Sequence, residues 1–519
     1  MAFPKKYTIL LLTIFLIGLS VRFINFRESV YFGYDEARDA FISQNIFLEG
    51  DLKLLGPQAS AFTGIHHGPF YYYLIGPLFL LGGGDPYFVS VVFRIINALG
   101  ILGVFAVGYL FASPLTGIIS AFIYAFSYEQ FIYAIFTGNP AVSNVSWILM
   151  FSGAGIIYKK KDKKALGLTM MLFGASLIPQ FDMIIGYSLI VCVLLLFLLK
   201  DKIRDIPRKK KLLAGFFGLS PLYTYLIAEI KYNFIATKTA LQLIKSDISV
   251  VGQNESEISI FLNNFLGLFR NNIFDLSLSD TLIGVFIALV ILFLIINSKK
   301  NRHNLFIVIW ILSFSSLVLA RGFMPLYSYA GVGIGLIIAT GIVFDKLFKK
   351  NKLLVISLLF LIVFSNVTKT IQQSSKSLVV EIKAQPGMKL SDEIDLIEKT
   401  YSYSGNEAFT IRTTSMPYRI QTVWAYLYKQ YGEKNHSYLP FFETGNVEGF
   451  PGSLPSPRKG TTCNRFLIVE PTRGIPQNLQ DRDKNEENFF SEIIKEEKIG
   501  EFILQHRLAR DKDCHNQKP

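Results

Sequence analysis

The sequence lacks the signatures of several common protein classes. Its 519 residues include only three cysteines, and none has the spacing of a metal site. Cys192 lies in an apolar run, so at most one disulfide can form, between Cys463 and Cys514, and it would need an oxidising compartment. No Walker loop or dinucleotide fingerprint occurs in a loop, which argues against an ATP-driven pump. No internal repeat or low-complexity tract stands out.

Apolar residues, in contrast, are abundant. They make up 51% of the chain and are concentrated in long runs, which is typical of a polytopic membrane protein. The formal net charge of +13 could suggest nucleic-acid binding. The Lys and Arg residues, however, fall in short clusters between apolar runs, where orientation in a membrane explains them better. We therefore expect membrane lipids as partners and no nucleic acid.

Eleven apolar runs are candidates for crossing a bilayer, whose hydrocarbon core is about 30 Å thick. The first, residues 7–26, follows Lys5 and Lys6 and precedes no small-residue cleavage site, so we interpret it as an uncleaved span that starts in the cytoplasm. The other ten cover residues 88–111, 115–135, 141–158, 165–180, 183–199, 212–230, 280–297, 304–320, 326–346 and 352–371.

The basic loops give an orientation. With a cytoplasmic N-terminus, even-numbered crossings return to the cytoplasm, where loops should be rich in Lys and Arg. The clusters at 159–164, 200–211, 299–302 and 346–352 all fall on that side. The same topology places two long loops, 27–86 and 231–279, on the outside.

The C-terminal part, 372–519, is also placed outside, and it changes abruptly to a charged composition rich in Asn, Ser and Pro. Runs 408–411 and 466–469 have strand character, whereas 421–431 and 488–498 have a helical pattern. We predict a multi-pass plasma-membrane protein with about eleven helices in a membrane domain, 1–371, and a small extracytoplasmic α/β domain, 372–519.

An adjacent acid pair, Asp35 and Glu36, directly follows the first span. Carboxylates at a membrane surface are poorly placed unless they have a role. From Ala37 to Gly50 apolar residues recur at helical spacing, which predicts an amphipathic helix on the membrane surface. Asp35 could be the N-cap of that helix, a role that does not exclude catalysis, and Glu36 could complement the helix dipole.

Further polar residues gather near the same surface. An ionised side chain in hydrocarbon costs at least ~2.5 kcal/mol, so one polar cavity at the outer leaflet is the economical explanation. Arg94 is too deep to reach headgroups comfortably, and we expect an acid or a phosphate as its partner, whereas Arg22 and Arg321 could snorkel. The other candidate lining residues are Arg38, His66, His67, Asn139, Gln180, Asp182, Tyr327 and Tyr329.

The adjacent histidines His66 and His67 have a poor spacing for two ligands of one metal and are more typical of a loop. A divalent metal is left open, and no cofactor is certain.

The order of these features resembles the GT-C membrane glycosyltransferases, above all the branch with protein O-mannosyltransferases and the aminoarabinose transferases of lipid A. The matching features are Asp-Glu-Ala-Arg at 35–38, Gly50-Asp51, His-Gly-Pro-Phe-Tyr-Tyr-Tyr-Leu at 67–74, Arg94, Gln180-Phe-Asp182 and the segment 321–329. The resemblance covers 1–200 well and 320–346 loosely. Two departures concern the acceptor pocket: related bacterial sequences would have His at 182, and many carry Arg near Asn139-Pro140.

The resemblance implies transfer of a sugar from a polyprenyl-phosphate carrier to a glycan, lipid or protein acceptor on the outer face, usually with inversion. It implies that Asp35 is the general base, with Glu36 orienting the acceptor or a metal. By chemistry, Arg94 and Arg321 are our candidates for binding the departing lipid phosphate. The alternative is a transporter or flippase of a lipid-linked glycan, although such proteins typically have repeat-related halves. Eleven spans exceed what an anchor for an external binding domain needs.

Overall fold

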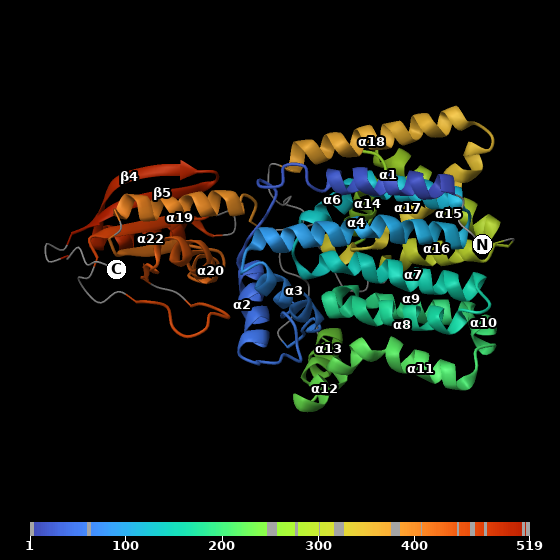
Figure 1. The fold of residues 1–519 in the computed structure, drawn as a ribbon, viewed down its shortest axis with the longest axis horizontal. Helices are drawn as coiled ribbons and strands as arrows, with labels where there is room; N and C mark the ends of the chain where they lie inside the picture. Colours follow the sequence, from blue (N-terminus) through green and yellow to red (C-terminus); the bar gives the residue numbers. More distant parts are fainter. Residues whose placement is uncertain are drawn as a thin grey trace.

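The computed structural model describes residues 5–59, 64–245, 257–275, 279–299, 301–315, 326–374, 385–405, 407–443, 446–456, 462–471, 475–510 and 514. A body of long helices carries most of the chain, and a small domain containing a sheet lies beyond one end of it (Figure 1). We call this domain, residues 385–510, the tail domain.

The long helices of the body run side by side along one direction (Figure 1). They are α1 Lys5–Val21, α4 Pro86–Phe111, α5 Pro114–Phe126, α6 Tyr128–Ile135, α7 Ser143–Lys159, α8 Lys164–Phe181, α9 Ser188–Leu198, α11 Arg208–Gly218, α12 Tyr223–Lys231, α14 Glu257–Asn272, α15 Asp280–Ser298, α16 His303–Leu312, α17 Val332–Phe348 and α18 Lys352–Ser374. Shorter helices connect them: η1 Asn139–Val142, η2 Met183–Tyr187, α10 Lys200–Arg204, η3 Ser220–Leu222, α13 Ile235–Lys245 and η5 Leu326–Tyr329. Buried rings fill the core, where Phe151 and Trp310 stack with centroids 3.9 Å apart.

Four helical segments of the described chain are long and apolar enough to cross a membrane: Pro86–Phe111, Asn139–Lys159, Asp280–Ser298 and Lys352–Ser374. Two bent pairs, α5 with α6 and α11 with η3–α12, raise the number to six if each pair is one span. The bends are 58° and 46°, so the runs at 115–135 and 212–230 are not the straight spans that hydropathy suggests. The count of eleven spans stays a prediction.

At the break between α5 and α6, side chains accept hydrogen bonds from backbone N–H groups that lack a helical partner. Ser127 Oγ accepts the Gln130 N–H at 3.3 Å, and Asn366 Oδ1 accepts the Tyr128 N–H at 2.9 Å. Because lipid offers no hydrogen bonds, a helix can bend inside a membrane protein only where such partners replace the lost backbone bonds.

Arg22 fastens the end of the body that faces the tail domain. It is fully buried, so it does not snorkel. Its guanidinium donates to Gly18 O in α1 at 2.9 Å, to Tyr124 O at 3.0 Å and Ala125 O in α5, and to Asn97 Oδ1 in α4 at 3.1 Å. A cation is favoured at helix C-termini, where carbonyls lack partners. Arg22 therefore joins three helices where the chain leaves α1.

Two helices lie between the body and the tail domain. They are α2, Tyr34–Leu48, which runs across the end of the long helices, and α3, Phe70–Leu81 (Figure 1). The helix predicted from Ala37 to Gly50 is thus present but begins three residues earlier, with Gly33 as its N-cap. Asp35 is therefore not the cap.

The tail domain has a five-stranded sheet in the order β2-β1-β3-β5-β4. Its strands are β1 Phe409–Thr414, β2 Phe441–Phe442, β3 Asn464–Val469, β4 Ser491–Ile499 and β5 Phe502–Ala509. The first three are parallel, and β5 is antiparallel to both β3 and β4. The helices are α19 Leu390–Ser404, α20 Thr422–Leu427, η6 Tyr428–Glu433, α21 Lys434–His436 and α22 Gln477–Phe490.

One element of the tail domain was predicted wrongly. The helical pattern at 488–498 is in fact mostly strand β4. Its residues pair with β5 across a turn in which Gly500 has φ +57°, a conformation that glycine adopts at little cost. The strands predicted at 408–411 and 466–469 fall within β1 and β3.

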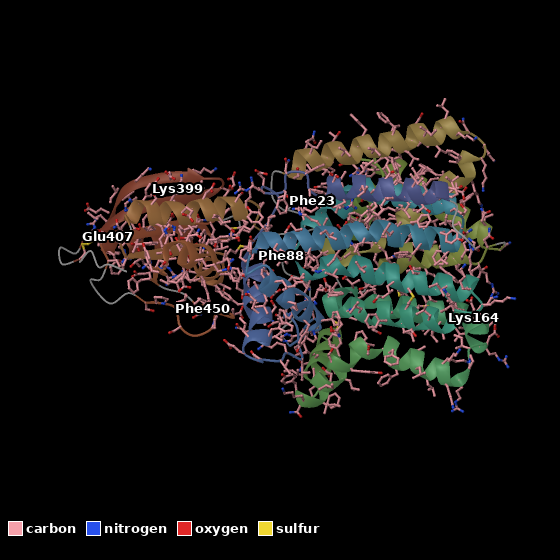
Figure 2. The ribbon with its side chains drawn as sticks, in the orientation of Figure 1. Phe23, Phe88, Lys164, Lys399, Glu407 and Phe450 are labelled. Atoms are coloured by element: carbon pink, nitrogen blue, oxygen red, sulfur yellow. A yellow bond between two sulfur atoms is a disulfide. The ribbon has the colours of Figure 1, made fainter. Side chains whose placement is uncertain are left out.

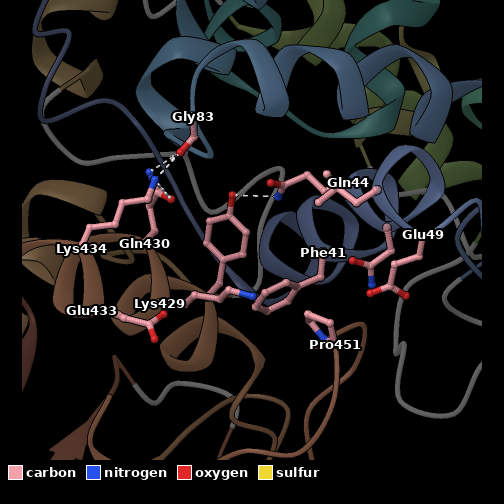
Figure 3. A pocket seen from close by; sticks show the side chains of 12 residues that line it. Phe41, Gln44, Glu49, Gly83, Lys429, Gln430, Glu433, Lys434 and Pro451 are labelled. Carbon is pink, nitrogen blue, oxygen red and sulfur yellow. Dashed lines mark hydrogen bonds between the residues drawn. The ribbon is translucent and has the colours of Figure 1, made fainter. Parts of the chain in front are cut away.

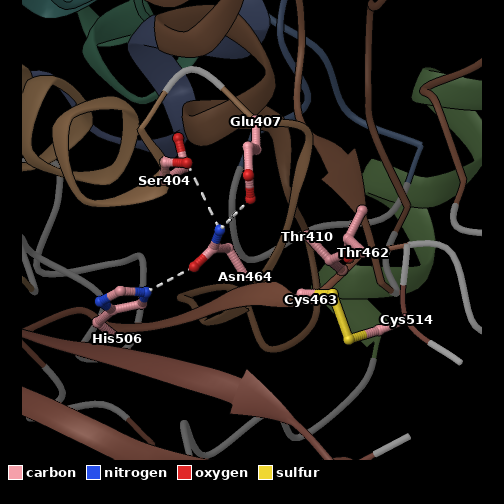
Figure 4. The surroundings of a disulfide bond; sticks show 8 residues. All are labelled: Ser404, Glu407, Thr410, Thr462, Cys463, Asn464, His506 and Cys514. Atoms are coloured by element: carbon pink, nitrogen blue, oxygen red, sulfur yellow. Dashed lines mark hydrogen bonds between the residues drawn. A yellow bond between two sulfur atoms is a disulfide. The ribbon is translucent and has the colours of Figure 1, made fainter. Parts of the chain in front are cut away.

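Cys463 and Cys514 form a disulfide with a Cα–Cα distance of 5.1 Å (Figure 4). It is the one pairing that the sequence allows. Next to it, Asn464 donates to Glu407 at 3.2 Å and bonds His506 Nε2 at 2.9 Å, so the end of the chain is fastened to the start of β3.

Three buried carboxyl groups lie near one another where the tail domain meets α2. Glu393, Glu470 and Glu36 are 0%, 2% and 5% exposed. Within the described part of the chain, neither carboxyl oxygen of Glu393 has a hydrogen-bond partner. Burial first, then the charges of Glu470, Asp392 and Glu36, raise the pKa of Glu393 well above its usual value.

The replacement Glu393→Gln should stabilise the protein at high pH. Because the folded pKa is raised, stability is full below the unfolded value near pH 4.5 and declines as pH rises toward the folded pKa. We expect thermal unfolding of the purified protein to show a gain of about 1–3 kcal/mol at pH 8 and little change at pH 4.5. The exposed Asp395 of the same helix supplies the control Asp395→Asn, and an equal gain in both variants would contradict the assignment.

Candidate active site

The first turns of α2 present an ion triad, Asp35, Arg38 and Asp39. Arg38 Nη1 lies 3.0 Å from Asp35 Oδ1, and Arg38 Nη2 lies 2.8 Å from Asp39 Oδ1. Residues three and four apart share one helix face, which is why one guanidinium reaches both acids. The Asp35 side chain is 53% exposed, whereas that of Asp39 is 5% exposed. Asp35 is therefore the acid that can meet a substrate.

Burial and charge set the ionisation of the triad. Burial alone would lower the pKa of Arg38, but Asp39 and Asp35 outweigh it and raise that pKa. Burial raises the pKa of Asp39 to about 6, although Arg38 opposes the rise. Arg38 thus stays charged beside Asp35. The ring of Tyr34 lies 5.3 Å from the guanidinium, at a distance that favours a cation–π contact.

Glu36 points away from this face. Its carboxylate accepts the backbone N–H of Gly33 at 3.2 Å, which is the glutamate half of a capping box. The side chain is buried and therefore positions the start of α2 and, with it, Asp35.

His67 lies on the body side of the triad. Its Nδ1 accepts the backbone N–H of Met183 at 2.9 Å; because that N–H can only donate, the ring proton sits on Nε2. Asp182 Oδ1 lies 3.5 Å from the same Nδ1. Because Nδ1 carries no proton, the two atoms are both acceptors and form neither a hydrogen bond nor an ion pair. Burial, followed by the charge of Arg38, lowers the pKa of His67 to about 4, so the ring is neutral at pH 7.

His66 turns toward its own loop, where Nδ1 contacts Gly56 O at 3.1 Å. The backbone of this loop pairs with itself, since Gly56 N–H donates to His67 O at 2.9 Å and His67 N–H to Pro57 O at 2.9 Å. Gly68 packs against the body: an added Cβ would lie 2.0 Å from Gln180 Oε1. The His-Gly-Pro motif therefore allows close approach of the loop to α8.

The floor beneath the loop comes from the end of α8, the residue that follows it, and η1. Gln180 is buried and donates to Pro221 O at 2.6 Å and to Thr224 Oγ1 at 3.0 Å. Asp182 caps η2 by accepting the Ile184 N–H at 3.0 Å. Asn139 donates to Phe181 O. These three predicted residues are thus brought together with His67.

The turn η5 also reaches this floor, since it packs against η1 and η2. Tyr187 of η2 donates to Ser328 O at 3.0 Å. The Tyr329 hydroxyl is buried and accepts from Asn264 at 2.5 Å, and Tyr327 is half-buried. Arg321 lies outside the described residues.

Arg94 lies away from this group. It is fully buried and donates to Arg22 O, to Ser29 Oγ at 2.8 Å and to Ser90 Oγ at 3.2 Å, and the ring of Phe26 lies 4.8 Å from its guanidinium. The acid or phosphate expected as its partner is replaced by a backbone carbonyl, two hydroxyls and a ring. We therefore assign Arg94 to fastening the segment between α1 and α2, and it has no part in the proposal below.

The tail domain closes the other side of α2 with the segment 446–451, which we call the strap. The hydroxyl of Tyr34 donates to Glu448, and Asn45 donates to Gly449 O at 2.9 Å. Phe450, labelled in Figure 2, meets Phe41 edge to face at 5.4 Å. The strap thus lies beside the exposed acid Asp35.

Sequence reasoning missed Asp39 and the strap. Asp39 could have been found, because Asp35 and Asp39 have the i, i+4 spacing that lets one arginine bridge them. Glu448 carries no such signal, since it reaches Tyr34 only through the tertiary fold. Among the residues described, no three or more His, Cys, Asp or Glu side chains are placed to hold a metal ion, and no step below uses one.

No protein-family model and no curated protein matches this sequence. Solved structures do match. The crystal structure of ArnT, a lipid A aminoarabinose transferase, from Cupriavidus metallidurans in the apo state has a TM-score of 0.61 and 11% identity over 99% of both chains. The chain has the GT-C fold. The structure of the oligosaccharyltransferase AglB from Archaeoglobus fulgidus, in complex with an inhibitory peptide and a dolichol-phosphate, has a TM-score of 0.49 and 13% identity. The match covers 85% of this chain and 65% of the AglB chain.

Removal of Arg38 should leave Asp39 as an unpaired buried acid. We expect Arg38→Gln to lower the free energy of unfolding by about 3 kcal/mol, measured by thermal unfolding of the purified protein at pH 8. The double variant Arg38→Gln/Asp39→Asn should regain most of that loss, because it removes the stranded charge. Arg510→Gln, at a residue 54% exposed, is the matched control. A double variant no more stable than Arg38→Gln alone would show that the two side chains are not coupled.

Proposed function

We propose that this protein is a glycosyltransferase that moves a sugar from a polyprenyl-phosphate carrier to a hydroxyl of a glycan, lipid or protein acceptor, with inversion, on the extracytoplasmic face of the plasma membrane. The observation that carries the proposal is the exposed Asp35, held by Arg38 at the junction of the helical body and the tail domain in a chain with the GT-C fold.

Asp35 acts as the general base. As the acceptor oxygen attacks the anomeric carbon, its proton passes to the Asp35 carboxylate. A bond forms between that oxygen and the carbon, the bond from the carbon to the phosphate oxygen breaks, and the lipid phosphate leaves with the electron pair. Attack opposite to the leaving phosphate inverts the configuration. The proton on Asp35 is then released to water, which its 53% exposed side chain allows.

The remaining site residues position this base and the donor. Arg38 orients Asp35, and Asp39 holds Arg38 in turn. The neutral ring of His67 keeps an Nε2–H donor, which suits an oxygen of the donor phosphate. Arg321 remains our candidate for binding the same phosphate. The floor of the substrate pocket is assigned to Asn139, Gln180, Asp182, Tyr327 and Tyr329.

Two observations support the location. The disulfide between Cys463 and Cys514 belongs to an oxidising compartment. Lys164, in the basic loop predicted to be cytoplasmic, lies at the end of the body opposite the tail domain, whereas Phe23 and Phe88 lie near it (Figure 2). For the rival function, a transporter, polar groups are expected near mid-membrane, but the site residues gather at one end of the body.

The replacement Asp35→Asn tests the base. We expect release of polyprenyl phosphate from supplied polyprenyl-phosphate sugars to fall by about 10²–10⁴-fold, with no change in the unfolding temperature, because Asp35 is half exposed. Asp205→Asn, at an exposed residue that pairs with Lys164 at the opposite end of the body, should retain turnover. Undiminished turnover in the Asp35 variant would remove that residue as base.

The location is tested by thiol labelling of intact cells. Cys463 and Cys514 should react with a membrane-impermeant maleimide only after an impermeant reductant has opened their bond, because Cys192 is buried. The variant Cys463→Ser/Cys514→Ser should stay unlabelled. Labelling that requires permeabilised cells would place the tail domain in the cytoplasm.

A further inference from the structure

A pocket of about 270 Å³ lies between the second half of α2 and the tail domain (Figure 3). It is lined by residues of α2, by Gly83 in the loop after α3, by α20, η6 and Lys434 of α21, and by the end of the strap. Its size is at the lower end for ligand sites, which commonly enclose about 300–1,000 Å³, and suits a single ring better than a long chain.

The walls of the pocket are held in place from both sides. Tyr426 donates to Gly84 O at 2.7 Å, Gln430 donates to Gly83 O at 3.0 Å, and Tyr431 donates to Asp85 Oδ1 at 2.9 Å. Gly84 has φ +87° and leaves no space for a Cβ, which would lie 2.4 Å from Gln430 Oε1. The pocket is therefore preformed, so a ligand would not have to order it.

The amide and carboxylate side chains of the lining offer hydrogen-bond acceptors. Gln44 already donates to Ala40 O at 2.9 Å and Tyr426 at 3.2 Å, and Asn45 donates to Gly449 O at 2.9 Å, which leaves their carbonyl oxygens as acceptors. Glu49 and Glu433 are exposed, and their carboxylates make no hydrogen bond or ion pair with any described residue. A ligand that satisfies this set must carry several donors.

The positive charges of the pocket are already occupied. Lys434 donates to Gln430 Oε1 at 2.7 Å and to Gly83 O, and Lys429 lies 5.2 Å from the ring of Phe450. Two lysines also balance the two glutamates, so the pocket favours neither a polyanion nor a polycation. Phe41 and Tyr426 supply an apolar wall, with their centroids 4.8 Å apart. Several hydroxyls and one apolar face are the chemistry of a neutral sugar ring.

We propose that this pocket is an accessory subsite that holds a distal, uncharged sugar of a glycan acceptor. The proposal rests on the proposed function. Gln44 and Asn45 follow Asp35 by nine and ten residues, which is about 14–15 Å along an α-helix. A sugar held there would leave the reacting hydroxyl, a few sugar units away, free to reach Asp35. Acceptors built of several sugars would then be preferred over single sugars.

Binding is tested on the purified full-length protein by saturation-transfer NMR with methyl β-D-glucopyranoside, glucosamine and glucose 6-phosphate. We expect transfer to the neutral glucoside from the wild type. It should fall about three- to tenfold in Glu49→Gln/Glu433→Gln, as expected for one or two weakened hydrogen bonds, and should be lost in Glu433→Trp, whose indole fills the pocket. Glu501→Gln, at an exposed residue of the β4–β5 turn, is the control and should match the wild type.

Three results would overturn the subsite: equal transfer in all variants, stronger transfer to glucose 6-phosphate than to the glucoside, or transfer to glucosamine alone, which would indicate an ammonium site. The Asp35→Asn protein should bind the glucoside as the wild type does. Failure of the proposed function would appear as retained turnover in that variant, whereas failure of the subsite would appear as unchanged binding in the pocket variants, so the two are separable.

Discussion

A buried guanidinium must direct its N–H groups to acceptors, and this requirement organises the junction between the helical body and the tail domain. Arg22 uses the carbonyls at the ends of α1 and α5. Arg94 then uses the carbonyl of Arg22 itself and the hydroxyl of Ser29. The segment from α1 to α2 is thereby fixed at both its ends. Arg38, which is only partly buried, holds the acids of α2. The position of Asp35 thus depends on Arg22 and Arg94 as well as on Arg38.

The surface helix α2 is shared by two neighbours with different tasks. On one side, α3 packs against α2, because Gly76 allows close contact with Ser43 O and the ring of Phe47. On the other side, the strap and α20 of the tail domain fit against Phe41 and Asn45. A helix that is packed on both sides cannot shift without breaking one set of contacts. The tail domain is therefore part of the scaffold that sets the acid face, and not an independent appendage.

Hydropathy and short motifs predicted the helical body, the surface helix and the presence of two tail strands, because these depend on local periodicity. They did not predict the bends at Ser127 and Pro221, where side chains from distant helices replace backbone bonds. Nor did they predict strand β4, whose Lys- and Glu-rich sequence has a helical pattern but pairs with β5. The hydrogen bonds of Arg94 to Ser29 and Arg22 were not predicted either, because these neighbours are remote in sequence. Tertiary partners decided each of these cases.

The acids of α2 show why adjacent carboxylates in one motif need not share a role. Glu36 is buried and accepts the N–H of Gly33, so its role is to hold the start of α2. Asp39 is buried too, and burial raises its pKa to about 6 although Arg38 opposes the rise. Asp35 meets the same guanidinium from the exposed side, where water and substrates can reach it. A base must be oriented and accessible at once, and of these three acids Asp35 alone combines the two conditions.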